Sequence, residues 1–376
     1  MYDCAIVGAG PSGASAAYHL AKKGRSVIIL EKETLPRYKP CGGGVAPIVA
    51  EWFDFDFSEA ISLKVDTVRY TWKMEDSVEL PLLEQNIKPI WMVRREVFDR
   101  FLVDKAREQG AQLRSPAKVE GIEWKENHWQ LNSSQGLFAA KYTIAADGAK
   151  GPMASWLGFT KRKCLIGSAM EVEAPARVLD KNVAHFEFGA VANGYAWNFP
   201  KADGYSVGVG IFAGRKKQHL KQILHDYASN LFGINLEQIR HHGHPIFLWN
   251  GQQKLHTQNA VLAGEAACVV DPFTAEGIRP SIFSGIQAAL AVDRAIAGES
   301  DALEKYSELL NFEWGKEMAW AQRLAQLFYR APGICYQQAV KRPSATRKMM
   351  QIFCGQLRYS DAAGSAIKRI SGGLLA

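Results

Sequence analysis

The stretch that decides the fold reads DCAIVGAGPSGASAAYHLAKKGRSVIILE and spans residues 3–31. Asp3–Val7 and Ser26–Leu30 are short apolar runs that predict buried strands, and Ala17 and Leu20 lie at helical spacing between them. The residues after the first strand have the spacing G-x-G-x-x-G, and an acidic residue ends the second strand. A bare G-x-G-x-x-G is a weak signal, but strand, helix and terminal acid together predict a dinucleotide-binding β-α-β unit.

Each part of this motif has a physical reason. Gly8 permits a tight turn, Gly10 lets the backbone approach a pyrophosphate, and Gly13 lets the helix pack closely on the sheet. The N-terminus of the helix offers free N–H groups and a positive dipole end to phosphates. Glu31, 18 residues beyond Gly13, is expected to accept hydrogen bonds from ribose hydroxyl groups. The alternative, a glycine-rich turn without a ligand, is disfavoured by the complete β-α-β context.

Length and composition exclude several protein classes. The 376 residues suggest two or three domains, and 47% hydrophobic with 22% charged residues exclude a disordered chain, a coiled coil and a disulfide scaffold. No run of 18 uncharged apolar residues occurs, so a membrane-spanning helix is not expected. The six cysteines lack a C-x-x-C pair, which indicates no zinc site and favours a reducing compartment. Because the first apolar run begins almost at Met1, we expect no signal peptide and a cytoplasmic protein.

Three later motifs extend the prediction. Asp147-Gly148 follows a strand-like run, Gly264-Glu265 precedes the segment DPFTAEGI at residues 271–278, and Arg95 opens the segment REVFD. Together with the glycine motif they resemble the para-hydroxybenzoate hydroxylase superfamily of FAD enzymes over most of residues 1–300. The resemblance implies bound FAD, with the arginine of REVFD facing it. The cofactor-binding residues that it implies are Gly8, Gly10, Gly13, Ala14, Glu31, Cys41, Gly42, Gly44, Arg95, Val119, Asp147, Glu265, Gly277 and Ile278.

One position departs from the superfamily pattern. The late motif usually reads Gly-Asp, with the aspartate on the ribityl chain of the flavin, whereas this chain has Gly264-Glu265. Glutamate keeps the charge and the acceptor oxygens but adds a methylene. The resemblance therefore implies that the loop shifts or that the contact passes through water.

Two segments indicate a branch of that superfamily. KPCGGG at residues 39–44 and YAWNFP at residues 195–200 resemble the geranylgeranyl reductase family, which has K-P-C-G-G and Y-x-W-x-F-P motifs. The resemblance implies an FAD-dependent oxidoreductase that reduces C=C bonds of isoprenoid chains on lipids, chlorophyll precursors or quinones, with NAD(P)H or reduced ferredoxin as electron donor. Cys41 is then the candidate catalytic proton donor, and the substrate-binding residues are Tyr195, Trp197, Phe199 and Pro200.

The residues themselves leave alternatives open. Tyr195, Trp197 and Phe199 alternate, so on a strand they share one face, which either fills a core or walls an apolar pocket. Cys41 is either a thiol beside glycines that let the backbone approach a flat ligand, or a small buried core residue. The segment GVGIFAG at residues 208–214 imitates a second nucleotide motif, but its alternation predicts an antiparallel strand.

Two other functions compete with prenyl reduction. The first is the oxidative branch of the superfamily, a flavin monooxygenase or halogenase. The second is a flavoprotein without catalysis that carries a lipid or pigment. The clustered His241, His242 and His244 lack a cysteine or carboxylate at ligand spacing, so we expect a solvated loop and no metal site.

The distribution of motifs predicts an α/β fold, α+β overall, with interleaved domains. A Rossmann-like FAD-binding domain is expected to alternate with an antiparallel-sheet substrate domain and to be followed by a C-terminal helical region. The expected ranges are 1–60, 90–160 and 256–300 for FAD, 61–89 and 161–255 for substrate, and 301–376 for the helices.

Basic charge is concentrated in the last 59 residues. The chain carries a net charge of +7, and residues 318–376 contain nine Lys or Arg against the single acid Asp361, which is +8. Apolar residues recur among them at near-helical spacing: Leu324, Leu327, Phe328, Met349, Met350, Ile352, Phe353 and Leu357. This pattern predicts either an amphipathic helix on an anionic membrane surface or a helical cap on the flavin domain. Nucleic acid is not expected, because no aromatic–basic groove pattern accompanies the charge.

Overall fold

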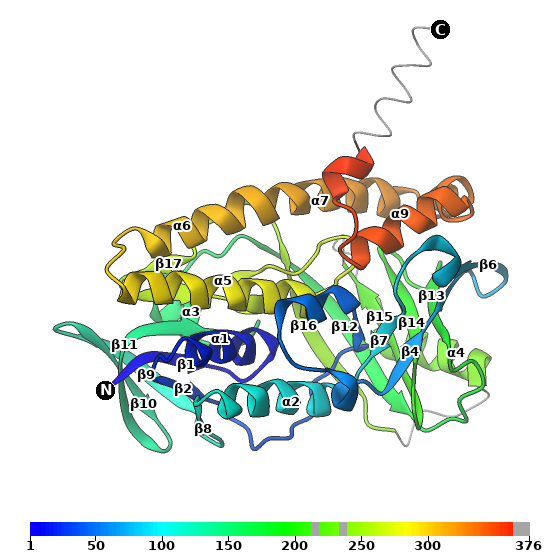
Figure 1. Ribbon diagram of the computed structural model, residues 1–376. Helices are drawn as coiled ribbons and strands as arrows, with labels where there is room; N and C mark the ends of the chain where they lie inside the picture. The colour runs from blue at the N-terminus through cyan, green and yellow to red at the C-terminus, as the bar shows by residue number, and fades with distance from the viewer. Residues whose placement is uncertain (213–217, 233–238, 364–376) are drawn as a thin grey trace, which may run out of the picture. The chain divides into compact units, whose positions relative to one another are not determined.

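The computed structural model describes residues 1–212, 218–232 and 239–363 (Figure 1). The chain divides into two compact units, each assembled from three segments. The first unit contains Met1–Lys39, Arg95–Leu165 and Ile246–Gly315. The second unit contains Pro40–Arg94, Ile166–Pro245 and the chain from Lys316 onward. The units are thus interleaved in sequence, with residues 40–60 and the C-terminal helices grouped with the second unit.

An eight-stranded sheet forms the centre of the first unit. Five of its strands are parallel, in the order β18-β11-β1-β2-β8, while β17 and the hairpin β9–β10 pair antiparallel. The strands are β1 (Tyr2–Val7), β2 (Val27–Leu30), β8 (Gln112–Arg114), β9 (Val119–Lys125), β10 (His128–Ser133), β11 (Gly136–Ala145), β17 (His256–Thr257) and β18 (Ala260–Leu262).

Helices complete the first unit, and α1 packs against both α5 and α2. The helices are α1 (Pro11–Lys22), α2 (Arg95–Glu108), α3 (Met153–Trp156), α5 (Ile278–Ile296) and α6 (Ala302–Leu309), with a 3-10 turn at Gly264–Ala267 and a π turn at Leu310–Trp314. The contact between α1 and α5 is close because a Cβ on Gly285 would lie 2.2 Å from the Ser12 carbonyl oxygen. The predicted β-α-β unit is confirmed here, as the three elements β1, α1 and β2.

A seven-stranded sheet forms the second unit, in the order β16-β12-β15-β14-β13-β5-β6, beside a small sheet β3-β7-β4. Most of its pairings are antiparallel, but β13 runs parallel to β5, so the sheet is mixed rather than wholly antiparallel. The strands are β3 (Gly44–Val45), β4 (Leu63–Val65), β5 (Thr67–Trp72), β6 (Asp76–Pro81), β7 (Ile90–Met92), β12 (Cys164–Ala174), β13 (Val183–Phe188), β14 (Gly194–Lys201), β15 (Gly204–Ile211) and β16 (His242–Trp249).

The remaining helices of the second unit are α4 (Leu220–Phe232), α7 (Gly315–Arg330), α8 (Pro332–Cys335) and α9 (Pro343–Phe353), with a π turn at Tyr336–Val340. Figure 1 labels α7 and α9 in the orange to red part of the chain. Apolar side chains of this basic region pack in the core of the second unit. Met350 and Tyr336 belong to the core cluster that contains Tyr70, and Phe328 and Ile352 are also buried. These apolar side chains therefore pack within the second unit. The sequence left two alternatives open for them, a membrane-surface helix and a cap on the flavin domain.

The structure describes only part of the basic region, because Lys368 and Arg369 lie outside the described residues. Over the residues that are described, no helix is long and apolar enough to cross a membrane. In the same residues no group of three or more His, Cys, Asp or Glu side chains could hold a metal ion, and His241 pairs with His225 through their Nε2 atoms at 2.8 Å.

Candidate functional site

The glycine motif forms a turn in which backbone excludes a side chain at two of the three glycines. Gly8 has φ +103°, and a Cβ there would lie 2.4 Å from the Ala146 carbonyl oxygen. A Cβ on Gly13 would lie 1.9 Å from the carbonyl oxygen of Gly8. Gly10 is the N-cap of α1, which begins at Pro11 without a side-chain cap or an acidic residue in its first turn. The helix N-terminus is thus open to an anion, as the motif predicts.

Two buried polar atoms near these elements have no hydrogen-bond partner among the described residues, Ser12 Oγ in the first turn of α1 and Asp147 Oδ1. Buried polar atoms are normally paired, so each fits a contact with a bound ligand. The first lies in the helix turn where a pyrophosphate would bind, and the second belongs to the predicted D-G motif. The residues present therefore fit a dinucleotide such as FAD.

Asp147 is held in one conformation. Its Oδ2 accepts the Met153 N–H at 2.9 Å, and a Cβ on Gly151 would lie 2.0 Å from this oxygen. Burial raises the pKa of Asp147 from 3.8 to about 6, because the ionised carboxylate is poorly solvated there. A carboxylate oriented in this way presents its second oxygen as a hydrogen-bond acceptor.

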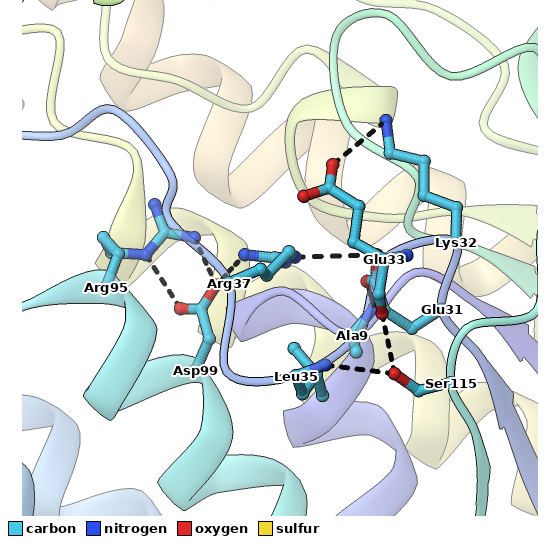
Figure 2. A network of polar contacts seen from close by, with 9 residues as sticks. All are labelled: Ala9, Glu31, Lys32, Glu33, Leu35, Arg37, Arg95, Asp99 and Ser115. Atoms are coloured by element: carbon cyan, nitrogen blue, oxygen red, sulfur yellow. Dashed lines mark hydrogen bonds and ion pairs between the residues drawn. The ribbon is translucent and has the colours of Figure 1, made fainter. Parts of the chain in front are cut away.

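Glu31 belongs to a network of charged groups (Figure 2). It is buried, and its Oε2 accepts the Ala9 N–H of the glycine motif at 2.8 Å. Arg37 lies between two carboxylates, with Nε 3.5 Å from Glu31 Oε1 and Nη1 3.0 Å from Asp99 Oδ2. Arg95 donates to Asp99 Oδ1 at 2.8 Å from one turn earlier in α2. Figure 2 shows the Asp99 carboxylate between the two guanidinium groups.

Arg37 was not predicted from the sequence. Its Nη2 lies 4.0 Å from the position of a Cβ on Gly10, so a positive charge stands beside the glycine motif. No motif or spacing distinguishes this arginine, and only the contact with Asp99, 62 residues away, reveals it. Arg95 is shown in an ion pair, and its contact with the cofactor stays a prediction.

The structure around the late motif shows how the longer side chain of Glu265 is accommodated. Its Oε1 accepts the Phe247 N–H at 3.1 Å, so the longer side chain contacts the backbone of β16. Arg162 donates to the Ala266 carbonyl oxygen at 3.0 Å, and its guanidinium lies 5.0 Å from the Phe247 ring centroid. Phe247 belongs to the part of β16 that groups with the first unit, so the extra methylene is accommodated by a contact within that unit.

The other predicted cofactor residues are placed as follows. Ala14 lies in the first turns of α1, where its N–H donates to the Gly10 carbonyl oxygen at 2.9 Å. Gly277 is the N-cap of α5 and Ile278 its first residue, and Val119 is the buried first residue of β9. Their contacts with FAD remain predictions.

The predicted aromatic strip lies on β14 in the second unit. The strands are paired so that Trp197 faces Phe186 of β13 and Gly208 of β15. A Cβ on Gly208 would lie 2.0 Å from the indole, so the glycine provides the space in which the ring of Trp197 lies. Tyr195 contacts the Phe186 ring edge to face, with centroids 5.4 Å apart. The strip is part of a larger aromatic face, in which Trp197 is buried and Tyr195 and Phe199 are partly buried.

The segment Cys41–Gly44 lies on this face. A Cβ on Gly42 would be 2.9 Å from Phe199 Cδ2 and 3.0 Å from Trp197 Nε1. Phe199 also lies 3.7 Å from the position of a Cβ on Gly44. Two motifs more than 150 residues apart therefore meet within one unit, with the thiol-bearing loop over the aromatic rings. Pro200, which follows Phe199, is buried on β14.

Two buried charged residues beside this loop were not predicted. Glu171 Oε1 accepts the Cys41 N–H at 2.7 Å, and Lys201 Nζ donates to the Gly42 carbonyl oxygen at 2.6 Å. Both side chains are almost fully buried, at 3% and 0% exposure. Lys201 directly follows the YAWNFP segment, which is a signal in the sequence, whereas nothing in the sequence around Glu171 pairs it with Cys41.

Two family models match the chain. The one described as FAD binding domain matches residues 1–195, more than half of the chain. The one described as geranylgeranyl reductase catalytic domain matches residues 166–241. This second range contains β14 and its aromatic strip.

Relatives agree with these matches. An uncharacterized protein of Methanosarcina barkeri is 33% identical over 78% of this chain and 75% of its own length. A digeranylgeranylglycerophospholipid reductase of Methanocaldococcus jannaschii is 26% identical over 88% of this chain and 86% of its own length.

Solved structures share the fold. A geranylgeranyl bacteriochlorophyll reductase-like protein from Thermoplasma acidophilum superposes with a TM-score of 0.77, at 23% identity over 87% of each chain. The flavin-dependent brominase Bmp2 superposes with a TM-score of 0.72, at 18% identity over 98% of this chain and 99% of its own. Of these two kinds of neighbour, the reductase is the one that the matched family models describe. The chain belongs to the geranylgeranyl reductase family of FAD-dependent oxidoreductases.

Proposed function

We propose that this protein reduces C=C bonds in geranylgeranyl-type chains attached to a lipid head group. The observation that carries the proposal is the contact of Gly42 with Trp197 and Phe199, which joins the K-P-C-G-G and Y-x-W-x-F-P motifs into one surface. A prenyl chain is apolar and flexible, and a face of aromatic rings suits it. The relatives named as digeranylgeranylglycerophospholipid reductases support a lipid-linked chain.

The first unit has the residues to hold FAD. The open N-terminus of α1 and Ser12 Oγ suit the pyrophosphate, and Glu31 suits the ribose. Asp147 and Glu265 are the proposed contacts to the flavin half. When bound and reduced, FAD supplies a hydride equivalent. NAD(P)H or a reduced ferredoxin is the proposed electron source.

The second unit has residues suited to the alkene. A trisubstituted C=C bond is unactivated, so proton addition leaves positive charge on carbon. The ring faces of Tyr195 and Trp197 stabilise such a charge by about 0.5–2 kcal/mol each. The Cys41 thiol gives the proton to the other carbon of the bond, and the Gly43 N–H, 3.4 Å from Sγ, remains as a donor to the sulfur.

The decisive experiment is anaerobic incubation with dithionite and a panel of geranylgeranyl lipids. Products are expected to gain mass in steps of two hydrogens. A set of reactions with O₂ and halide, with the same lipids, tests the oxidative branch to which the brominase belongs. Absence of any product two hydrogens heavier, from every prenyl substrate offered, would reject prenyl reduction.

We also propose that the basic C-terminal region holds the protein at an anionic membrane surface. Its exposed cations are Arg323, Arg330, Lys341, Arg342, Arg347 and Arg358. Because Phe328, Met350 and Ile352 are buried in the second unit, the attraction is expected to be electrostatic, at about 1 kcal/mol per Lys or Arg near the surface. In liposome flotation, binding should rise with anionic lipid and fall with salt. Equal recovery with neutral and anionic vesicles contradicts this proposal.

A further inference from the structure

The peptide group between Gly42 and Gly43 is hydrogen-bonded at both of its ends. Its carbonyl oxygen accepts from Lys201 Nζ at 2.6 Å, and its N–H donates to Cys41 Sγ at 3.4 Å. An ammonium group on the carbonyl oxygen polarises the amide and makes its N–H a stronger donor. The positive charge of Lys201 therefore acts on the Cys41 sulfur through a single peptide group.

This arrangement is fixed by close packing. Gly43 has φ +73°, and a Cβ there would lie 2.1 Å from the Val93 carbonyl oxygen and 2.7 Å from Lys201 Nζ. The Gly43 carbonyl oxygen also accepts the Val93 N–H at 2.8 Å. A side chain at Gly43 is thus excluded by backbone, and the next peptide group is held by the Val93 N–H beside the Gly42–Gly43 peptide.

Lys201 is a buried cation that lies near several charged side chains. Its side chain is fully buried, and burial lowers the pKa of Lys201 to about 8, opposed by the nearby carboxylates of Glu173 and Glu171. The Glu171 carboxylate, which accepts the Cys41 N–H, is a negative group next to the same loop.

Arg94 is a second cation near Lys201. It pairs with Glu173 at 2.8 Å and with Asp203, so two carboxylates compensate its charge. Lys201 and Glu171 are the groups hydrogen-bonded to Gly42 and Cys41 respectively.

We propose that Lys201 is a positioning residue for Cys41, acting through the Gly42–Gly43 peptide to favour and orient its thiolate, with Glu171 opposing it. The inference rests on the proposed role of Cys41 as proton donor. When the thiol gives up its proton, the negative charge left on Sγ is stabilised by the polarised Gly43 N–H. Lys201 and Glu171 thereby adjust how readily the Cys41 thiol loses its proton.

The test measures how the reactivity of the Cys41 thiol depends on pH, and it does not measure turnover. The flavin-loaded protein, without substrate, is alkylated with iodoacetamide across pH 6–10, and modification of the Cys41 peptide is followed by mass spectrometry. Lys201→Met should move the midpoint of the pH profile upward by about one pH unit, since a nearby cation favours the thiolate. Glu171→Gln, which keeps an acceptor for the Cys41 N–H, should move it downward. Lys88→Met, which removes an exposed lysine of the same unit, should leave it unchanged.

The opposite signs distinguish charge from structure, because a loosened loop would move both variants in the same direction. If Lys201→Met does not retain flavin, Lys201→Gln takes its place, since its amide keeps a donor for the Gly42 carbonyl. An unchanged midpoint in the neutral Lys201 variant, or equal shifts in the Lys201 and Glu171 variants, overturns the inference. Because no substrate is present, failure to reduce any prenyl lipid would reject the proposed function without changing this result.

Discussion

Replacing Asp147 by asparagine should change stability and cofactor binding in opposite directions. Folding raises the pKa of Asp147 from 3.8 to about 6 by burial, which corresponds to about 3 kcal/mol as an order of magnitude. Between about pH 4 and pH 6 the folded apoprotein binds a proton at this site that the unfolded chain has lost. The free energy of unfolding of the apoprotein should therefore fall as the pH rises through this window.

The asparagine side chain would carry no charge and would keep an acceptor for the Met153 N–H. The Asp147→Asn apoprotein should thus lose this pH dependence and be more stable than the unmodified protein at pH 7, by up to about 3 kcal/mol. Its affinity for FAD should fall, by about tenfold, because the unpaired Oδ1 is the proposed acceptor for the flavin half.

The assays are urea unfolding of the apoprotein at pH 4–7 and fluorescence titration with FAD. Asp226→Asn, at an exposed aspartate of the second unit, is the control and should alter neither quantity. A variant that is no more stable at pH 7, together with a flat profile for the unmodified protein, would refute the burial argument. Unchanged FAD affinity would refute the placement of Asp147 at the cofactor.

Three further substitutions test the two units. Glu31→Ala removes the acceptor for the Ala9 N–H and should weaken FAD binding at least tenfold, measured by retention of the yellow cofactor on dialysis, with Glu31→Gln less affected. Trp197→Phe should lower turnover on long prenyl chains several-fold while leaving the flavin spectrum intact; loss of folding instead would indicate that the indole is core packing. Glu265→Asp should cost about 1 kcal/mol in thermal unfolding, because the shorter side chain loses the Phe247 N–H, and an unaltered melting temperature would contradict that.

The parts predicted correctly from the sequence are those decided over short distances along the chain. The β1–α1–β2 unit is confirmed because the apolar runs, the glycines and the terminal acid lie within 29 residues and each has a local cause. The alternation of Tyr195, Trp197 and Phe199 likewise specifies one strand face from adjacent residues.

The parts that escaped prediction depend on strand register. Glu171 faces Gly208 on β15, which faces Trp197 on β14, so a glutamate comes to the aromatic face through two pairings. The parallel pairing of β5 with β13 is of the same kind, because either direction of pairing would satisfy the alternating pattern. Arg37 depends on a loop that brings it to Asp99 on α2. A periodic pattern assigns a face to each residue but does not assign its neighbour.

Glycine shows this difference most clearly. Gly8 and Gly208 each open a G-x-G sequence, and both exclude a Cβ in the structure. At Gly8 the obstacle is the backbone of Ala146, and the turn leads into the N-terminus of α1, which suits a phosphate ligand. At Gly208 the obstacle is the ring of Trp197, within the strand that the alternation predicts, although residues 213 and 214 of that segment lie outside the described residues. The same G-x-G spacing is therefore explained by a ligand in the first unit and by the Trp197 ring in the second. The two differ in their place in the fold, because Gly8 precedes the N-terminus of α1 whereas Gly208 lies inside β15.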